Sequence, residues 1–340
     1  MFMETNFVKL SGFTSMINMH SWMFLASFQK LRDDIILNKE IVTMLHLGAR
    51  AFDTIPGEVV QTVAHIFRNA NIGLQGVYFR LVNSTDKQED FFDHLNNQRL
   101  YATMDKYLEV PKHAFAYWAT EKDLQDFSYP KLKERGEISQ GLITGSVDLF
   151  LKYWFEVNME KINFHAGDAV DAENSGKKWF PYNKGGEYRK WRGNDDYVVN
   201  WENNGFAIKH FVDEKGKLRS RPQGTKHYFE DVITWTKIST STLSFRHKPT
   251  GYISSEAGMT ISVQESEKKY ILGLCNSKVA SHFLEFLSPT MNYELGDIEE
   301  IPVCVTLHVV ITMVHLVIVS ITIIRVTVSS MKQLPIQERL

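Results

Sequence analysis

The order of apolar and polar residues over residues 12–82 predicts four strands and one helix. The helix is residues 27–37 (SFQKLRDDIIL), where apolar side chains recur at helical spacing and charged residues lie on the other face. The strand-like runs are residues 13–25, 41–47, 58–68 and 76–82. The first two strands and the helix form a β-α-β unit, and the turn-rich link NANIGLQ joins the last two strands as a hairpin. We therefore expect a parallel sheet that ends in an antiparallel hairpin.

The remainder of the chain mixes helical and strand-like segments. Helical spacing returns around residues 91–100, within the more polar residues 84–135. Residues 147–157 (VDLFLKYWFEV) predict an amphipathic or largely buried helix, and residues 270–287 predict one long helix. Between them, residues 197–261 read as short strands separated by glycine-containing turns. The pattern as a whole predicts an α/β protein.

Composition excludes a globally basic nucleic-acid binder. The 340 residues are 44% hydrophobic and 23% charged, with a net charge of −2, so any surface that binds nucleic acid must be local. Only two cysteines occur, Cys275 and Cys304, and no Cys/His spacing fits zinc, which favours a reducing compartment. The first residues lack the pattern of a signal peptide, and we expect a cytoplasmic protein.

One stretch, residues 175–194 (SGKKWFPYNKGGEYRKWRGN), departs strongly from this neutral average. It holds six Lys or Arg residues, one acid and five aromatic residues. Cations neutralise phosphates, and aromatic faces stack on exposed bases. If the stretch is helical, Arg189 and Arg192 lie about one turn apart and reach phosphates or guanine edges together. The alternative is a solvated loop whose aromatic rings pack beneath it while the lysines extend to water.

A second basic run, Lys215 to Arg221, follows next to a turn and could share the same positive face. Arg246, His247 and Lys248 are weaker candidates. The residues expected to contact DNA are Lys177, Lys178, Trp179, Tyr182, Lys184, Arg189, Lys190, Trp191, Arg192, Lys217, Arg219 and Arg221. No GxGxxG, GxxxxGK, HExxH or GxSxG motif occurs in the sequence, so no catalytic or metal-ligating residue is predicted.

Three blocks of the sequence identify a family by resemblance. GLITGSVDLFLKYWFEV, SGKKWFPYNKGGEYRKWRGNDDYVVNWENNG and KGKLRSRPQ closely resemble the PglX family, the adenine-specific DNA methyltransferases of bacterial BREX phage-defence systems. The resemblance covers residues 8 to about 303. Residues 233–258 and 272–303 are also similar to the target-recognition region of these enzymes and of type I specificity subunits.

The resemblance implies an α/β fold made of the second half of a Rossmann-like methyltransferase domain followed by an α+β target-recognition region. The implied divisions are residues 1–83 for the partial methyltransferase domain, 84–160 for a helical connecting region, 161–303 for target recognition and 304–340 for an anomalous tail. Phe52, after the turn LGARAF, takes the place of the aromatic residue that packs against the flipped target adenine. The alternative for Phe52 is an ordinary core phenylalanine.

The family's catalytic loop, Asn-Pro-Pro-Tyr, does not occur, because none of the nine prolines is next to another. The glycine-rich loop for S-adenosylmethionine, the family's cofactor, has no match either. We therefore expect the C-terminal portion of a longer methyltransferase, inactive alone and without a cofactor of its own. The implied partners are double-stranded DNA, the missing N-terminal half and other BREX proteins. The alternative function is a non-catalytic DNA-binding remnant.

The tail has a different composition from everything before it. Residues 303–324 (VCVTLHVVITMVHLVIVSITII) contain no Lys, Arg, Asp or Glu, and their length and apolarity fit a transmembrane helix. Two histidines and heavy β-branching argue against that assignment. Because the change is abrupt, we favour translation of residues 304–340 out of frame over a tail-anchored membrane protein.

Overall fold

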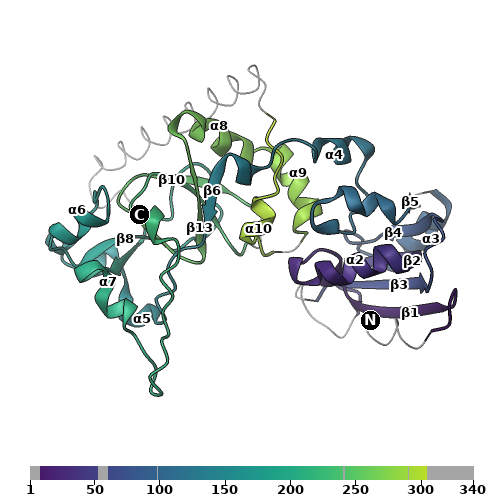
Figure 1. Cartoon of the computed structure of the whole chain (residues 1–340), viewed down its shortest axis with the longest axis horizontal. Helices are drawn as coiled ribbons and strands as arrows, with labels where there is room; N and C mark the ends of the chain where they lie inside the picture. Colours follow the sequence, from purple (N-terminus) through teal and green to yellow (C-terminus); the bar gives the residue numbers. More distant parts are fainter. Residues whose placement is uncertain (1–7, 53–59, 98, 240–241, 290, 305–340) are drawn as a thin grey trace. The chain divides into compact units, whose positions relative to one another are not determined.

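The computed structural model describes residues 8–52, 60–97, 99–239, 242–289 and 291–304. These residues fold into two compact units, which are described separately (Figure 1). The first unit holds the described residues of Met1–Tyr129 together with Glu285–Pro289, and the second holds those of Pro130–Leu284 and Thr290–Leu340. The expected apolar run (residues 303–324) and the proposed out-of-frame tail (residues 304–340) lie outside the described residues from residue 305 onward.

A five-stranded mixed sheet forms the centre of the first unit. Its order is β1 (Phe13–Met19), β3 (Thr62–Arg68), β2 (Glu40–Gly48), β4 (Gly76–Arg80) and β5 (Leu100–Ala102). Strand β3 is antiparallel to both β1 and β2, so β1 and β2 run in the same direction. Strand β4 pairs with β2 in parallel, and β5 pairs with β4 antiparallel. Three strands, β1, β2 and β4, therefore end at the same edge of the sheet.

The expected hairpin between the third and fourth strands is wrong. Both edges of β3 are occupied by β1 and β2, so no edge remains for β4, which pairs with the free edge of β2. The β1-α2-β2 order agrees with the expectation, but the first strand ends at Met19 instead of residue 25, and the sheet is mixed instead of parallel. The pairing differs because strand partners are chosen by long-range contacts that a local pattern of apolar residues does not encode.

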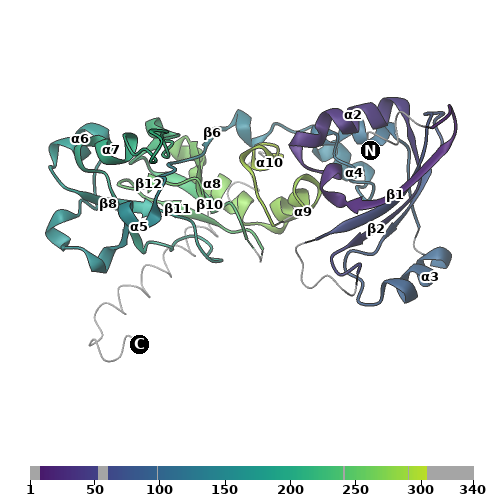
Figure 2. The ribbon, with the colours of Figure 1, turned by 90° about the horizontal axis from the view of Figure 1, so that it is seen from below.

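One face of this sheet is covered and the other is open. Helix α2 (Gln29–Asn38) lies along the covered face, where Met44 and Phe67 are buried (Figure 2). On the open face, Ile17 is 56% exposed and Ile66 is 38% exposed. Side chains that alternate along a strand point to opposite faces, which explains the sharp contrast between neighbours such as Ile66 and Phe67.

Buried Arg32 of α2 fastens the segments around the covered face. Its Nη1 donates to the main-chain carbonyls of Trp22 and Leu25, both at 2.8 Å, and its Nη2 donates to Lys112 O at 2.9 Å. Burial lowers the pKa of Arg32 to about 10. The charge is thus compensated by carbonyl dipoles, which a buried guanidinium requires. The unit also contains α3 (Lys87–Asn97) and α4 (Glu121–Asp126).

The second unit contains two four-stranded sheets. The antiparallel sheet has the order β11 (Phe245–Lys248), β10 (Val232–Thr236), β13 (Gly258–Val263) and β6 (Gly136–Ser139). The other sheet has the order β12 (Ile253–Ser254), β8 (Trp179–Asn183), β9 (Tyr197–Asn200) and β7 (Leu151–Tyr153). The helices are α5 (Val147–Phe150), α6 (Ala169–Asn174), α7 (Glu202–Lys209), α8 (Glu265–Cys275), α9 (Lys278–Leu287), whose end belongs to the first unit, and α10 (Leu295–Ile298).

Short 3₁₀ turns connect many of these elements. They are His20–Met23, Ala26–Phe28, Asp105–Glu109, Pro111–His113, Leu132–Glu134, Trp154–Glu156, Met159–Lys161 and Thr225–His227. The expected helical connecting region thus consists of short helices, 3₁₀ turns and strands β5, β6 and β7, with the division between the two units falling at Tyr129.

Two expected helices of the second unit differ in the structure. Residues 147–157 form only the four-residue α5 before the chain becomes β7, whose Leu151 pairs with Val199 of β9. The aromatic residues of this segment favour an extended backbone once a partner strand is present. The expected helix over residues 270–287 is two helices, because the side chain of Asn276 binds the main chain of Phe245 through both its oxygen and its Nδ2, at 3.0 and 2.9 Å.

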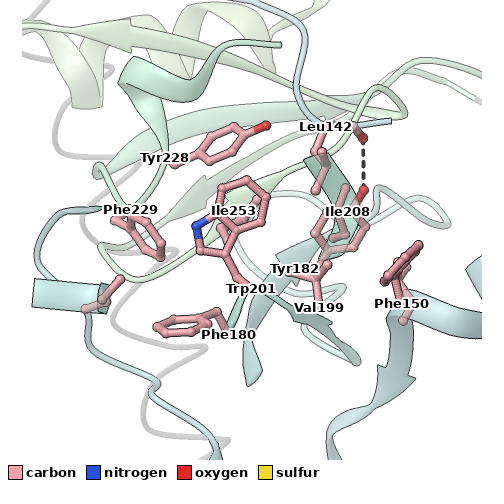
Figure 3. Packing of buried hydrophobic residues seen from close by; sticks show 13 residues of the cluster. Leu142, Phe150, Phe180, Tyr182, Val199, Trp201, Ile208, Tyr228, Phe229 and Ile253 are labelled. Atoms are coloured by element: carbon pink, nitrogen blue, oxygen red, sulfur yellow. Dashed lines mark hydrogen bonds between the residues drawn. The ribbon is translucent and has the colours of Figure 1, made fainter. Parts of the chain in front are cut away.

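The core around the sheet β12-β8-β9-β7 is rich in aromatic residues (Figure 3). Phe180 and Phe229 meet edge to face, and so do Trp201 and Tyr228. The hydroxyl of Tyr182 donates to Leu142 O at 3.0 Å, so this ring is held by a hydrogen bond as well as by packing. A fully buried ring contributes about 1.5–3 kcal/mol of transfer free energy, which makes this cluster the main stabilising element of its sheet.

Candidate nucleic-acid interface

The basic-aromatic stretch, residues 175–194, is a buried strand followed by a loop. Its strand is β8, which pairs with β9 and β12, and every residue of β8 is buried. Trp179 is 9% exposed and Tyr182 is 3% exposed, so of the two roles expected for these rings, stacking or bracing, they occupy positions that brace. The helical arrangement considered for Arg189 and Arg192 is wrong, since both lie in the loop after β8.

Four lysines of the stretch already have partners within the second unit. Lys177 Nζ donates to Glu160 O at 2.5 Å, and Lys190 Nζ donates to Asn276 O at 2.8 Å. Lys178 pairs with Glu202 at 3.9 Å, and the ammonium of Lys184 lies 4.3 Å from the ring centroid of Tyr197. Each of these two ammonium groups uses one of its three N–H donors in this way, so the partners restrict where Lys177 and Lys190 can place their charge.

The loop after β8 is bent by residues with left-handed backbone. Gly186 has φ +135°, and a Cβ there would lie 2.9 Å from the side chain of Asn194. Trp191 has φ 74° and joins the loop to β11, donating to Phe245 O at 3.0 Å and accepting from His247 N at 2.8 Å. Gly186 thus allows the loop to approach its own chain closely.

Two buried cations of β11 hold this loop from below. Arg246 is 0% exposed and donates from Nη1 to Arg189 O at 3.4 Å. Lys248 is 1% exposed, donates from Nζ to Gly193 O and Asn194 O at 2.8 and 3.0 Å, and forms an ion pair with Asp195. Residues two apart on a strand share a face, which is why both side chains reach the same loop.

Burial and the attraction between Lys248 and Asp195 shift the pKa of each group in opposite directions. Burial lowers the pKa of Lys248, while the Asp195 carboxylate raises it, and the result is a lowered pKa. Desolvation raises the pKa of Asp195, but Lys248, the hydrogen bond from Tyr252 and the charge of Arg192 together outweigh it, and the pKa lies below its usual range. The sequence showed these cations as a short basic run and gave no sign that they are buried.

Of the remaining candidate cations, Arg192 is half-buried and the other four are exposed. Arg189 lies on the loop, and Lys217, Arg219 and Arg221 lie on a hairpin closed by a bridge between Val212 and Leu218. Asp213 shapes the hairpin turn, since its Oδ1 accepts from the main-chain N–H groups of Lys215 and Lys217 at 2.9 Å. Exposed cations on a fixed loop and a fixed hairpin can neutralise phosphates without first breaking internal bonds.

In the first unit, Phe52 follows the end of β2. It is 42% exposed, and it comes four residues after Gly48, the last residue of that strand. Exposure favours a surface role for Phe52 over the alternative of an ordinary core residue. In α/β sheets the carboxyl ends of strands are the usual place for ligands, and Phe52 follows such an end.

A pocket of about 400 Å³ lies at the same edge of the sheet. His20, His46, Arg80 and Trp118 contribute to its wall. Nδ1 of His20 and Nε2 of His46 are 2.8 Å apart, and Nδ1 of His46 is 3.2 Å from the hydroxyl of Tyr117. Burial lowers the pKa of His20 to about 4, and burial with nearby His20, Arg80 and Lys87 lowers the pKa of His46 well below its usual range. Both histidines are therefore neutral at pH 7.

The sequence did not point to this pocket. Its histidines are 26 residues apart and were indistinguishable from scattered surface or core histidines. They meet because β1 and β2 run in the same direction on either side of β3, an arrangement that the local pattern did not reveal.

No protein-family model matches the chain. The chain is 39% identical over 315 residues to "Adenine-specific methyltransferase PglX" of Lacticaseibacillus casei (strain Zhang), covering 88% of this chain and 26% of the relative. It is 37% identical over 318 residues to "Adenine-specific methyltransferase BrxX" of Escherichia coli O9:H4 (strain HS), covering 91% of this chain and 25% of the relative. The chain thus spans about a quarter of the length of these curated relatives. The resemblance to the PglX family is confirmed.

Solved structures resemble the chain more distantly. The type IIL restriction-modification enzyme MmeI in complex with DNA gives a TM-score of 0.49 at 11% identity, covering 86% of this chain and 39% of that one. A DrdV–DNA complex gives 0.39 at 13% identity, covering 74% and 30% of the two chains. At this level of similarity, neither structure informs the assignment of function. In the part of the chain that the structure describes, no helix is long and apolar enough to cross a membrane.

Proposed function

Because the chain is related over about nine tenths of its length to the adenine-specific methyltransferases PglX and BrxX, we propose that it supplies the DNA-contacting part of an adenine-N6 DNA methyltransferase of phage defence. The second unit recognises double-stranded DNA, and Phe52 of the first unit packs against the flipped target adenine. The observation that carries the proposal is this sequence relationship, and the exposed cations of the second unit support it.

The geometry of the second unit suits recognition because its cations are held in place. Arg189 lies on a loop whose carbonyl oxygens are bound by two buried cations, and Arg219 and Arg221 lie on a hairpin bonded to its neighbours through the main chain. A side chain that is positioned before binding loses less conformational entropy on contact with DNA. The DNA-binding set of this proposal is led by Arg189, Arg192, Lys217, Arg219 and Arg221. Lys177, Lys178, Lys184 and Lys190 also belong to it, but each is drawn toward a partner within the second unit.

Methyl transfer in this family uses an Asn-Pro-Pro-Tyr loop and a glycine-rich loop for S-adenosylmethionine, and neither occurs in these 340 residues. S-adenosylmethionine carries a positively charged sulfonium, whereas the pocket beside β2 holds the guanidinium of Arg80 with Lys87 nearby. That pocket does not fit the cofactor, and no catalytic step is assigned to it. The chain therefore binds DNA without transferring a methyl group, and it works with the rest of the enzyme and with other BREX proteins in the cytoplasm.

The proposal is tested by the salt dependence of DNA binding. Fluorescence anisotropy with a labelled duplex is measured at several salt concentrations for the chain and for Arg189→Ala/Lys217→Ala/Arg219→Ala. If each cation neutralises one phosphate, the slope of log K against log salt becomes shallower by about 2 to 3. The control is Lys30→Ala/Lys122→Ala/Lys269→Ala, which removes the same charge from exposed sites elsewhere. Equal slopes for the two triple variants would reject the proposed interface.

The expected inactivity of the chain alone has its own test. The purified chain is incubated with radiolabelled S-adenosylmethionine and duplex DNA. We expect no transfer above a preparation from cells without the gene. Methylated adenine in the product would show that the chain carries the reaction by itself.

A further inference from the structure

The pocket beside β2 lies where three strands of the same direction end. His20 comes directly after β1, and His46 is paired with Arg80 in the parallel register of β2 and β4. Strand β3 begins at this edge, where Thr62 is the partner of both Met19 and Gly48. Two side chains of the pocket wall, those of His46 and Arg80, therefore stand on neighbouring hydrogen-bonded strands.

Arg80 is the unusual member of this pocket. Its guanidinium carbon lies 4.6 Å from the ring centroid of Trp118. Within the described residues, the side chain of Arg80 makes no hydrogen bond and no ion pair, and its Nε is buried without an acceptor. The indole Nε1 of Trp118 is also buried without an acceptor in this part of the chain. A buried donor left without an acceptor costs about 1–3 kcal/mol, more when it is charged, so both groups favour an acceptor from outside the protein.

The surrounding charges favour an anion. Lys87 is close enough to lower the pKa of His46, and its Nζ donates to Leu81 O at 3.0 Å. The two histidines are neutral, so they add no positive charge. Both ring nitrogens of His46 are engaged by His20 and Tyr117, which leaves Nε2 of His20 to bond a ligand oxygen. Glu285 contributes a carboxylate to the wall, where it is exposed and forms no ion pair with Arg80.

We propose that this pocket binds a phosphate group, carried by a nucleotide or by the nucleic-acid backbone. A guanidinium presents paired N–H groups that match two phosphate oxygens, and this arrangement is stronger than a single neutral hydrogen bond. The stacked ring of Trp118 holds the plane of the Arg80 guanidinium. The inference goes beyond the proposed function, because it depends on no residue of the second unit.

The test is calorimetric titration of the full chain with inorganic phosphate, with deoxyadenosine 5′-monophosphate and with deoxyadenosine. We expect the first two to bind and deoxyadenosine not to bind. Arg80→Met should weaken binding at least about tenfold, a loss of about 1.4 kcal/mol. The matched control is Arg68→Met in β3: this arginine also lies over a ring, 5.4 Å from Phe13, and it occupies the opposite edge of the same sheet. Arg68→Met should bind phosphate as the unaltered chain does.

Further arms identify the source of the phosphate and separate this inference from the proposed function. A short single-stranded oligonucleotide without a terminal phosphate binds if the ligand is the backbone, and does not bind if it is a free nucleotide. The triple variant of Arg189, Lys217 and Arg219 should keep its affinity for the monophosphate. If Arg80→Met does not fold, Arg80→Gln provides the comparison.

Three results would overturn the phosphate pocket. The first is no binding of phosphate or monophosphate up to about 10 mM, an affinity too weak for a built site. The second is equal binding of deoxyadenosine and its monophosphate, which would show recognition of the base. The third is unchanged affinity in folded Arg80→Met or Arg80→Gln.

Discussion

Lys248 donates a hydrogen bond from its buried ammonium to the main-chain carbonyl of Gly193 at 2.8 Å. The same ammonium binds Asn194 O at 3.0 Å and pairs with Asp195, so one lysine fixes three consecutive residues of the loop after β8. The position of the exposed cations on that loop is therefore decided by residues of β11, more than fifty positions later in the sequence.

Replacing this lysine should destabilise the second unit. Lys248→Met leaves two carbonyl oxygens without their donor, and we expect a loss of about 2–4 kcal/mol in the free energy of unfolding, measured by urea denaturation. The matched control is Lys226→Met, since Lys226 is 64% exposed and pairs with Glu137 at the surface. An exposed pair of this kind is worth about 0–1 kcal/mol. Equal losses for the two variants would contradict the anchoring role of Lys248.

Stability should fall in mild acid because of the two neutral histidines at the sheet edge. The pKa of His20 is lowered from 6.5 to about 4 by burial, so between these values the unfolded chain binds more protons than the folded one. The contribution is complete above pH 6.5 and is lost as the pH falls toward 4, by up to about 1.4 kcal/mol per pH unit. Urea denaturation across this range measures the loss.

The variants for this pH experiment are His20→Gln and His165→Gln. His20→Gln should make the free energy of unfolding less dependent on pH between 6.5 and 4, whereas His165→Gln, at an exposed site, should leave the dependence unchanged. An identical pH profile for the His20 variant and the unaltered chain would show that its burial does not control stability.

Gly186 should tolerate alanine less well than Gly216. Both have positive φ, but Gly186 lies at +135° with its missing Cβ 2.9 Å from Asn194, whereas Gly216 lies at +74° with open space around it. We expect Gly216→Ala to cost about 1 kcal/mol and Gly186→Ala about 2–3 kcal/mol. Thermal denaturation compares them, and a smaller shift for Gly186→Ala would argue against the close packing of this loop.

The open face of the first sheet should promote self-association. Ile17 and Ile66 are exposed there, and apolar sheet surface left in water favours contact with other molecules. Ile17→Thr/Ile66→Thr should lower the sedimentation coefficient of a concentrated sample toward that of the monomer. Leu37→Thr is the control, because Leu37 is 70% exposed but belongs to helix α2. If only Leu37→Thr reduced association, the surface responsible for self-association would not be the open face of the sheet.

The sequence pattern was sufficient for elements defined by nearby residues. It located β1, α2 and β2, since their apolar spacing depends only on neighbours. It did not locate β7, where pairing with Val199 overrides a helical pattern at Leu151. It also did not separate buried cations from exposed ones: Lys248 and Lys217 look alike in sequence, and only the fold decides that one lies under a loop and the other on a hairpin.

The insertion of β3 between β1 and β2 sets the order in which the first unit can assemble during synthesis. When the ribosome has released the chain as far as Gly48, β1 and β2 are both present, yet neither is the hydrogen-bonding neighbour of the other. The missing partner is Thr62–Arg68, and β1 pairs only with it, along its whole length from Phe13↔Arg68 to Met19↔Thr62. A nascent chain that ends before Thr62 therefore exposes β1 and β2 without their common partner strand. A chaperone that binds extended apolar peptide can bind the chain at this stage of synthesis.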